Sequence, residues 1–286
     1  DRAEAFIGSA FNFNKTHLYY EYDQNNLGLD QKPLDVFGIQ QEFLFPTVYF
    51  AGKQVNMKSY DLAASNYEIR KKALERALTA SYYEYRYAKE KETIYGQLDS
   101  LYADFASKSA RRFELGETTY LEKITSLSKR RQITVWLEKS KQDVAIAYKS
   151  IAKLVQAGEI LEIVLEPIHR VPLKSDPVSG IPELDHYMNR ISLAEAARSL
   201  EKQRLLPDIT LNYFQETNSG LDNHLYGYQL GLKIPLFFGG QSSKIKASKI
   251  ASDIAVEESE EYRIRLDARL QELQTALTKY DQAFAY

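Results

Sequence analysis

Residues 228–240 read YQLGLKIPLFFGG, and residues 37–52 read FGIQQEFLFPTVYFAG. Each stretch is an alternating segment that reaches a proline, Pro235 or Pro46, continues through aromatic residues and ends at glycine. Each then runs directly into a long, charged stretch of helical character. A strand-and-helix unit that occurs twice indicates a repeated architecture. The sequence therefore predicts an internal two-fold repeat, with one sheet built from two equivalent pieces.

Four segments alternate with a period of two residues, which is typical of β-strands with one buried face. They are Phe11–Tyr22, Val36–Phe45, Asp208–Glu216 and Tyr226–Ile234. Polar loops rich in turn-forming residues lie between the members of each pair, at residues 23–35 and 218–224. We therefore expect two β-hairpins, the first at residues 11–50 and the second at residues 208–238.

The fourth segment separates cleanly into an apolar side and a side of glycine, glutamine and lysine. This division fits a barrel wall with lipid outside and water inside, but it also fits a soluble sheet with one face on a core. Four strands cannot close a barrel, so a barrel would need several copies of the chain. The residues expected to face lipid are Tyr226, Tyr228, Leu230, Leu232 and Ile234.

A very long helical region lies between the two hairpins. From about Asn56 to about Phe113 there is no proline, and Gly96 is the one glycine. Apolar residues step by three and four, close to the 3.5-residue repeat of coiled-coil packing. We expect a long helical hairpin at 53–158, with its tip near 114–119. The stepping residues are Leu74, Leu78, Tyr85, Ala88, Ile94, Leu98, Leu101 and Phe105 before the tip, and Leu137, Val144 and Ile151 after it.

The rest of the chain is expected to be an irregular segment and a helix at 159–205, then a last helix from residue 241. Its apolar residues again step by four and three, from Leu266 to Phe284. We expect residues 241–286 to be the start of a second long helical hairpin that is truncated in this chain. The fold class expected is mainly α-helical with a small antiparallel β part.

The composition excludes several classes of function. The 286 residues carry a net charge of −2, which gives no electrostatic reason to expect a nucleic-acid partner. No cysteine is present, so thiol chemistry and zinc–thiolate sites are excluded. No phosphate-binding glycine loop occurs, and the histidines lack the spacing of a metal site. We expect no enzyme, no catalytic residues, no cofactor and no metal; the four histidines are His17, His169, His186 and His224.

Three passages resemble a known family, the TolC-like outer-membrane efflux proteins. Residues 44–53 (LFPTVYFAGK) and 235–240 (PLFFGG) are similar to its two strand-to-helix junctions. Residues 112–123 (RFELGETTYLEK) resemble its periplasmic tip, where one helix turns into the next. The three passages occur in the family's order and spacing, and the resemblance covers most of the chain. The junctions and the tip are most similar to the heavy-metal cation efflux branch.

The resemblance implies a homotrimer whose four strands per chain form a twelve-stranded barrel in the outer-membrane lipid of a Gram-negative bacterium. The helices would form a tunnel, an α-barrel, in the periplasm. A periplasmic adaptor (membrane fusion) protein and an inner-membrane pump would be the partners, and the chain would be a passive exit duct for metal cations or drugs. Residues 1–286 would be one fragment of such a protein, because the family's pattern extends past both ends.

The resemblance also implies two sets of functional residues. Gly116 permits a tight turn, and the exposed apolar groups beside it need a partner. The other interpretation is a helix stop followed by a Thr118 or Thr119 N-cap with Glu122, and both can hold together. The adaptor-docking tip would be Arg112, Leu115, Gly116, Glu117, Thr118 and Tyr120, and the strand-to-helix junctions Pro46, Gly52, Pro235, Gly239 and Gly240.

A soluble structural or adaptor-like protein remains the alternative. Its hairpins would form an ordinary sheet, and its helical hairpin would bind another protein. The two hypotheses differ at Leu230, Leu232 and Ile234, which meet lipid in a duct and a core in a soluble domain.

Overall fold

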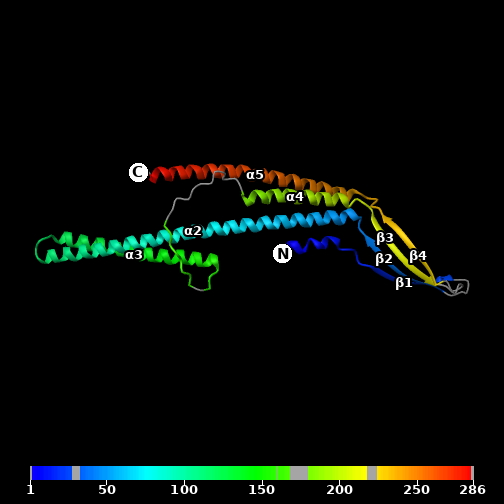
Figure 1. Cartoon of the computed structure of the whole chain (residues 1–286), viewed down its shortest axis with the longest axis horizontal. Helices are drawn as coiled ribbons and strands as arrows, with labels where there is room; N and C mark the ends of the chain where they lie inside the picture. The colour runs from blue at the N-terminus through cyan, green and yellow to red at the C-terminus, as the bar shows by residue number, and fades with distance from the viewer. Residues whose placement is uncertain (1, 28–32, 159, 168–179, 218–223, 285–286) are drawn as a thin grey trace. The chain divides into compact units, whose positions relative to one another are not determined.

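The computed structural model describes residues 2–27, 33–158, 160–167, 180–217 and 224–284. These residues fall into two compact units, one of residues 1–68 with 178–286 and one of residues 69–177. In chain order the elements are α1 (Arg2–Ala5), η1 (Gly8–Phe11), β1 (His17–Leu27), β2 (Pro33–Phe43), α2 (Pro46–Glu114), α3 (Tyr120–Val155), α4 (Pro182–Gln203), β3 (Asp208–Thr217), β4 (His224–Lys233) and α5 (Gly239–Phe284) (Figure 1).

The four strands form one antiparallel sheet in the order β1-β2-β3-β4. Each hairpin leads into a long helix, β2 into α2 and β4 into α5 (Figure 1). The predicted fold class and its internal repeat are confirmed. The two hairpins join directly through β2 and β3, where Ile39 is opposite Tyr213.

The first strand differs from its prediction at both ends. It begins at His17, because residues Gly8–Phe11 form a 3-10 helix instead. Phe11 and Phe13 lie before the strand, and both rings pack on α2. The Phe11 ring is 5.7 Å from that of Phe50, and the Phe13 ring is 5.4 Å from that of Tyr49.

The first hairpin also extends into the stretch expected to be a polar loop. Strand β1 runs to Leu27 and β2 starts at Pro33, so Tyr22 pairs with Asp35. Polar side chains do not prevent pairing, since the ladder is made by backbone groups. The remainder of that loop, residues 28–32, and residues 218–223 of the second loop lie outside the described residues.

The two strand-to-helix junctions are similar in sequence but differ in structure. Helix α2 begins at Pro46, seven residues before the predicted start of the helical hairpin at residue 53. Proline suits the first turn of a helix because its missing N–H would have no intrahelical acceptor there. Gly52 is therefore a helical residue within α2. At the second junction Pro235 lies between β4 and α5, and Gly239 is the first helical residue.

Helices α4 and α5 pack against each other in the first unit. The rings of Tyr187 and Tyr262 stack with their centroids 4.7 Å apart, and Arg190 forms an ion pair with Glu258. None of the helices that the structure describes combines the length and apolar character needed to cross a membrane.

Small residues line the seam of the α2–α3 hairpin in the second unit. On α3 the buried residues recur every seven positions, at Ser126, Ile133, Ser140 and Ala147. The predicted Leu137, Val144 and Ile151 alternate with them, and Ile151 is buried. In the part of α2 that belongs to this unit, the buried residues are Ala88, Ala106 and Ser109.

The predicted stripe on α2 was partly wrong. Leu74, Ile94, Leu101 and Phe105 remain exposed, although Ala88 is buried as expected. Leu78, Tyr85 and Leu98 are half-buried, and the Tyr85 ring lies 6.3 Å from that of Tyr148 on α3, so only the exposed members lie on an outer face of the helix. The small residues of the seam allow the two helices to approach closely, and serine and alanine are inconspicuous in a search for large apolar residues.

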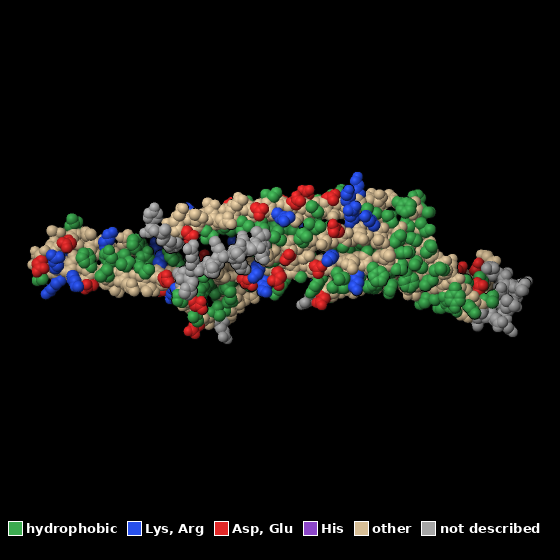
Figure 2. Space-filling model, turned by 45° about the horizontal axis from the view of Figure 1, so that its top comes forward, with side chains coloured by type: hydrophobic (Ala, Val, Ile, Leu, Met, Phe, Trp, Pro, Cys, Tyr) green, Lys and Arg blue, Asp and Glu red, His purple; other side chains and the backbone are tan. Residues whose placement is uncertain are grey.

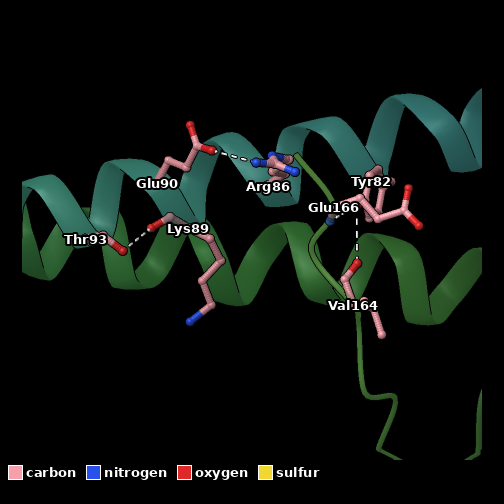
Figure 3. A network of polar contacts seen from close by, with 7 residues as sticks. All are labelled: Tyr82, Arg86, Lys89, Glu90, Thr93, Val164 and Glu166. Atoms are coloured by element: carbon pink, nitrogen blue, oxygen red, sulfur yellow. Dashed lines mark hydrogen bonds and ion pairs between the residues drawn. The ribbon is translucent and has the colours of Figure 1, made fainter. Parts of the chain in front are cut away.

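The described part of the irregular segment packs on its own helical hairpin (Figure 3). The hydroxyl of Tyr82 donates a hydrogen bond to the carbonyl of Val164 at 3.2 Å and accepts one from the N–H of Glu166 at 3.0 Å. The Tyr148 hydroxyl accepts another from the N–H of Leu161 at 2.8 Å. Residue 159 and residues 168–179 of the predicted segment lie outside the described residues.

Candidate functional site

The sheet has one apolar and one polar face. Directly opposed residues of an antiparallel pair project from the same side, so the strand register assigns every residue to a face. Figure 2 shows hydrophobic side chains gathered over this part of the first unit. Side chains that are 37–78% exposed form most of the apolar face: Leu18, Tyr20, Tyr22, Phe37, Ile39, Leu211, Tyr213, Tyr226, Tyr228, Leu230 and Leu232. The register also places the polar residues Asp35, Gln41 and Gln215 on this face.

The predicted lipid-facing residues of β4 lie on this apolar face. Tyr226, Tyr228, Leu230 and Leu232 are all largely exposed, and Ile234 is exposed one residue past the end of the strand. Strands β1, β2 and β3 continue the same face, although only the residues of β4 were expected to contact lipid. The alternation of apolar residues in these three strands also indicates this face. Apolar patches this wide are rare on soluble monomers and indicate that something covers them.

The opposite face of the sheet is mainly polar. Lys233 forms a 2.7 Å ion pair with Glu42 across this face. The amide of Asn212 donates a 3.0 Å hydrogen bond to the hydroxyl of Tyr19. Val36 and Leu225 are apolar members of the face; its polar members include His17, Glu21, Gln40, Glu42, Asp208, Thr210, Asn212, Glu216, Gln229 and Lys233.

Both edges of the sheet lack a neighbouring strand among the described residues, since β1 and β4 each pair on one side only. An open edge presents unpaired backbone N–H and C=O groups, which favour the addition of another strand. The sheet is thus incomplete in two ways, at its edges and on its apolar face.

The turn between α2 and α3 is closed by a glycine and two backbone hydrogen bonds. Gly116 has φ +73° in the left-handed region, and its N–H donates to the Phe113 carbonyl at 3.0 Å. The N–H of Glu117 donates to the Arg112 carbonyl at 2.9 Å. This pair of bonds is the Schellman arrangement that ends many helices.

The start of α3 is capped as the sequence suggested. The Thr119 hydroxyl accepts a hydrogen bond from the Glu122 N–H at 3.3 Å, so Thr119 is the N-cap. Thr118 donates its hydroxyl hydrogen to the Glu122 carboxylate. The Arg112 guanidinium lies 3.7 Å from the carboxylates of both Glu117 and Glu122. The helix-stop interpretation is therefore confirmed, and the docking role stays a prediction.

Apolar side chains are exposed at this tip. Leu115, Tyr120 and Leu121 are 60–72% exposed. The Tyr120 ring packs edge-on against Phe113 at 5.7 Å, and the Lys123 ammonium lies 4.8 Å from the centre of the Phe113 ring. Leu121 and Lys123 lie within the tip passage 112–123 but were not among the residues expected to dock an adaptor.

Helix α2 carries a second apolar stripe that stays open. Its exposed residues Tyr87, Ile94 and Leu101 recur every seven positions. A seven-residue repeat on a second face indicates that this helix has room for a further helical neighbour.

No catalytic arrangement occurs among the described residues, where no group of histidine, aspartate and glutamate side chains could hold a metal. His17 lies against the Tyr19 ring, and His186 is 3.4 Å from the Ser65 hydroxyl. His169 and the side chain of His224 lie outside the described residues. An open groove of about 1290 Å³, lined by Phe6, Tyr60 and Met188 among others, has no such cluster.

Comparison with solved structures identifies the fold. The structure of the Campylobacter jejuni CmeC outer-membrane channel matches with TM-score 0.69 and 12% identity over 92% of this chain and 63% of that one. Vibrio cholerae VceC, an outer-membrane protein, matches with TM-score 0.69 and 13% identity over 92% and 70%. CusC, which forms a transmembrane channel, matches with TM-score 0.71 and 14% identity over 98% and 73%.

The chain thus spans roughly two thirds of the length of these solved proteins. Its sequence matches no protein-family model and no curated protein. The structural likeness extends over nearly the whole chain, and it shows a shared fold.

Proposed function

We propose that this chain, which has the fold of the TolC-like outer-membrane efflux channels, contributes to the wall of such a channel. The observation that carries the proposal is the two-faced sheet with two open edges. In lipid every backbone polar group needs an internal partner, so a sheet can span a membrane only as a closed barrel. The apolar face would contact lipid and the polar face would line the water-filled lumen.

The proposed assembly is a homotrimer. Four strands are too few to close a barrel, whereas three copies of four strands make twelve. Strand β4 of one copy would pair with β1 of the next, so both open edges would be used. The strands are 10 or 11 residues long, the length needed to cross a bilayer at the usual tilt.

The second apolar stripe on α2 supports the same assembly. A two-helix hairpin needs only one packed seam on each helix. A helix with seams on two faces fits between two neighbours, as it does in a closed ring of helices. We propose that these helices line a tunnel in the periplasm, and that the sheet lies in the outer membrane of a Gram-negative bacterium.

The protein would be a passive exit duct of a tripartite efflux system and not an enzyme. The exposed apolar tip around Leu115 and Tyr120 would bind a periplasmic adaptor protein, and an inner-membrane pump would supply the energy. Metal cations or drugs are the proposed cargo. The similarity of the junctions and tip to the heavy-metal cation efflux branch favours metal cations.

The proposal is tested by introducing one charge on each face of β4. Leu230→Asp places a carboxylate on the apolar face, and Gln229→Asp places the same group on the polar face one residue away. We expect Leu230→Asp to abolish outer-membrane trimers and channel conductance in planar bilayers, and Gln229→Asp to retain both. A wild-type protein that stays soluble, monomeric and without conductance would contradict the proposal and favour the soluble alternative.

A further inference from the structure

The apolar face of the sheet continues past the ends of the strands onto helix α2. Phe43, the last residue of β2, lies on this face, and its ring is 5.7 Å from that of Phe13. Phe13 in turn packs on Tyr49 of α2, and Phe11 packs on both Tyr49 and Phe50. These ring contacts form a continuous apolar path from the sheet to the first two turns of the helix, where Phe50 is exposed.

A small groove of about 510 Å³ opens beside Phe50, between α2 and α4. On α2 its lining includes Phe50, Lys53 and Met57, which follow one another at steps of three and four residues and so share one side of the helix. On α4 its lining includes Gln203, whose side-chain oxygen accepts a 2.7 Å hydrogen bond from the Thr47 hydroxyl. The groove therefore brings apolar side chains, an amide and one ammonium group together.

Lys53 is the one charged residue among the described residues that line the groove, and none of them is acidic. No carboxylate in the described part of the chain forms an ion pair with Lys53. Lys58, five residues further along α2, is instead paired with Asp61 at 3.0 Å. The ammonium group of Lys53 thus remains available to an anion from outside the chain.

Positive charge is concentrated where the long helices leave the sheet. Residues 46–60 of α2 contain two lysines and no acidic residue, and residues 239–249 of α5 contain three lysines and no acidic residue. Residues 250–261 of α5 reverse the pattern, with five acidic residues and no basic one. Figure 2 shows basic side chains beside the hydrophobic ones of this unit. The apolar path therefore ends in a basic zone.

We infer that the groove binds the headgroup of an anionic glycerophospholipid in the leaflet of the outer membrane that faces the periplasm. The inference rests on the proposed function, in which the apolar face contacts lipid and the helices lie in the periplasm. Lys53 is seven residues past the start of α2, or about 10 Å along the helix, which places it at the level of the headgroups. Aromatic side chains favour this level, and a lysine can extend its ammonium group along it.

The chemistry of the groove favours a headgroup with net negative charge. The Lys53 ammonium would bind the phosphate oxygens, and the amides of Gln54 and Gln203 are further hydrogen-bond donors. Phe50 and Met57 would contact the glycerol and the first methylene groups. A zwitterionic lipid carries its own cation beside the phosphate, so the surrounding lysines would favour it less.

The test titrates detergent-solubilised trimers, purified from outer membranes, with phosphatidylglycerol or with phosphatidylcholine of the same acyl chains. Native mass spectrometry counts the bound lipids. The wild type should bind phosphatidylglycerol about five-fold or more tightly, and Lys53→Gln should reduce this preference to about two-fold or less. Lys53→Arg keeps the charge and should retain the preference.

Lys58→Gln is the matched control, because it removes the same charge from the same helix at a lysine that is already paired. It should keep the preference for phosphatidylglycerol. Phe50→Ala should weaken the binding of both lipids alike, since it removes an apolar contact. If Lys53→Gln does not assemble, the wild type alone provides a test: its preference should fall as the ionic strength rises to about 1 M, where charges are screened within about 3 Å.

The outcomes separate this inference from the proposed function. A wild type that forms no trimers in the outer membrane contradicts the proposed function. Trimers that bind both lipids equally, or whose preference is insensitive to ionic strength, overturn the lipid site and leave the channel standing. A preference that survives in Lys53→Gln, or that Lys58→Gln reduces as much, overturns the assignment to this groove.

Discussion

Arg112, in the last turn of α2, lies 3.7 Å from the carboxylate of Glu122, in the first turn of α3. One guanidinium therefore connects the two helices across the turn at the tip, and it is also 3.7 Å from Glu117 within that turn. The connection holds the exposed Leu115 and Tyr120 in one arrangement. Arg111, the preceding residue, pairs only within α2, with Glu114 at 3.6 Å.

Replacing Arg112 by alanine should weaken adaptor binding more than it weakens the fold. Exposed ion pairs contribute about 1 kcal/mol or less, so the thermal midpoint should change little. Binding to the cognate adaptor, measured by surface plasmon resonance, should fall because the tip loses its fixed geometry. Arg111→Ala is the control with the same loss of charge, and equal binding losses in both variants would contradict the positioning role.

Gly116→Ala should destabilise the helical hairpin. The residue has φ +73°, where a Cβ costs about 1–2 kcal/mol, and no neighbouring atom restricts the space. Gly96→Ala, in the interior of α2 and equally open, should instead stabilise the helix by about 1 kcal/mol. Chemical denaturation measures both. A stabilising Gly116→Ala would mean that the tip adopts another turn in solution.

Gln156 offers a stabilising substitution at the other end of α3. It is the C-cap residue with φ 51°, a conformation that glycine adopts without strain. Gln156→Gly should therefore raise the free energy of unfolding by up to about 1 kcal/mol. Gln156→Ala keeps the Cβ and should give no such gain, so a similar gain from alanine would argue against the strain.

Tyr82→Phe should release the segment that packs on the hairpin. The substitution removes both hydrogen bonds between the hydroxyl and residues 164 and 166 while keeping the ring (Figure 3). Limited proteolysis should cut residues 160–167 faster in this variant. Tyr83→Phe is the control, because its ring packs beside that of Tyr82 without those two bonds. Equal cleavage rates in Tyr82→Phe and wild type would contradict the prediction.

His186 should make the first unit slightly less stable in acid. Burial, followed by the nearby Arg190 charge, lowers the pKa of this histidine below its usual value. The unfolded chain then binds the proton first as the pH falls below about 6.5, so stability is full above that pH and declines below it. The side chain is only partly buried, so the loss should stay below about 1 kcal/mol.

The measurement is the thermal midpoint of wild type and His186→Gln between pH 5 and pH 8. The thermal midpoint of the variant should decline less between pH 6.5 and pH 5 than that of wild type, because the histidine is absent. Ser65 and Tyr187 also contact the imidazole. Identical pH profiles for the two proteins would contradict the prediction.

The sheet could be predicted well because alternation reports directly on its two faces. The alternation of Tyr228 and Leu230 with Gln229 was enough to predict the apolar face of β4, although the neighbouring strands were not known. The packed face of α2 was harder to predict from the sequence, because the helix has two faces with the same seven-residue repeat. The large residues Ile94 and Leu101 mark the open face of α2, while the small residues Ala88 and Ser109 lie on its buried face.

The junctions show a second limit of sequence reasoning. Pro46 and Pro235 follow similar strands, yet one begins a helix and the other precedes a helix by four residues. Proline is compatible with both situations, since it fits the first turn of a helix as well as an extended segment. The surrounding contacts decide whether a helix begins at the proline. In the first junction the Tyr49 hydroxyl accepts a 3.0 Å hydrogen bond from the N–H of Leu44.

The open edges of the sheet have a consequence for the order of biogenesis. The α2–α3 hairpin closes through contacts within one chain, such as the ion pair of Lys91 with Asp143. In the proposed trimer the four described strands of one chain leave the sheet unfinished, and its apolar face with unpaired edges is prone to aggregate in water. A newly exported copy should therefore pass through a stage with folded helices and an unfinished, protected β part. Completion of the sheet would then depend on the concentration of other copies, which makes its folding a reaction between molecules.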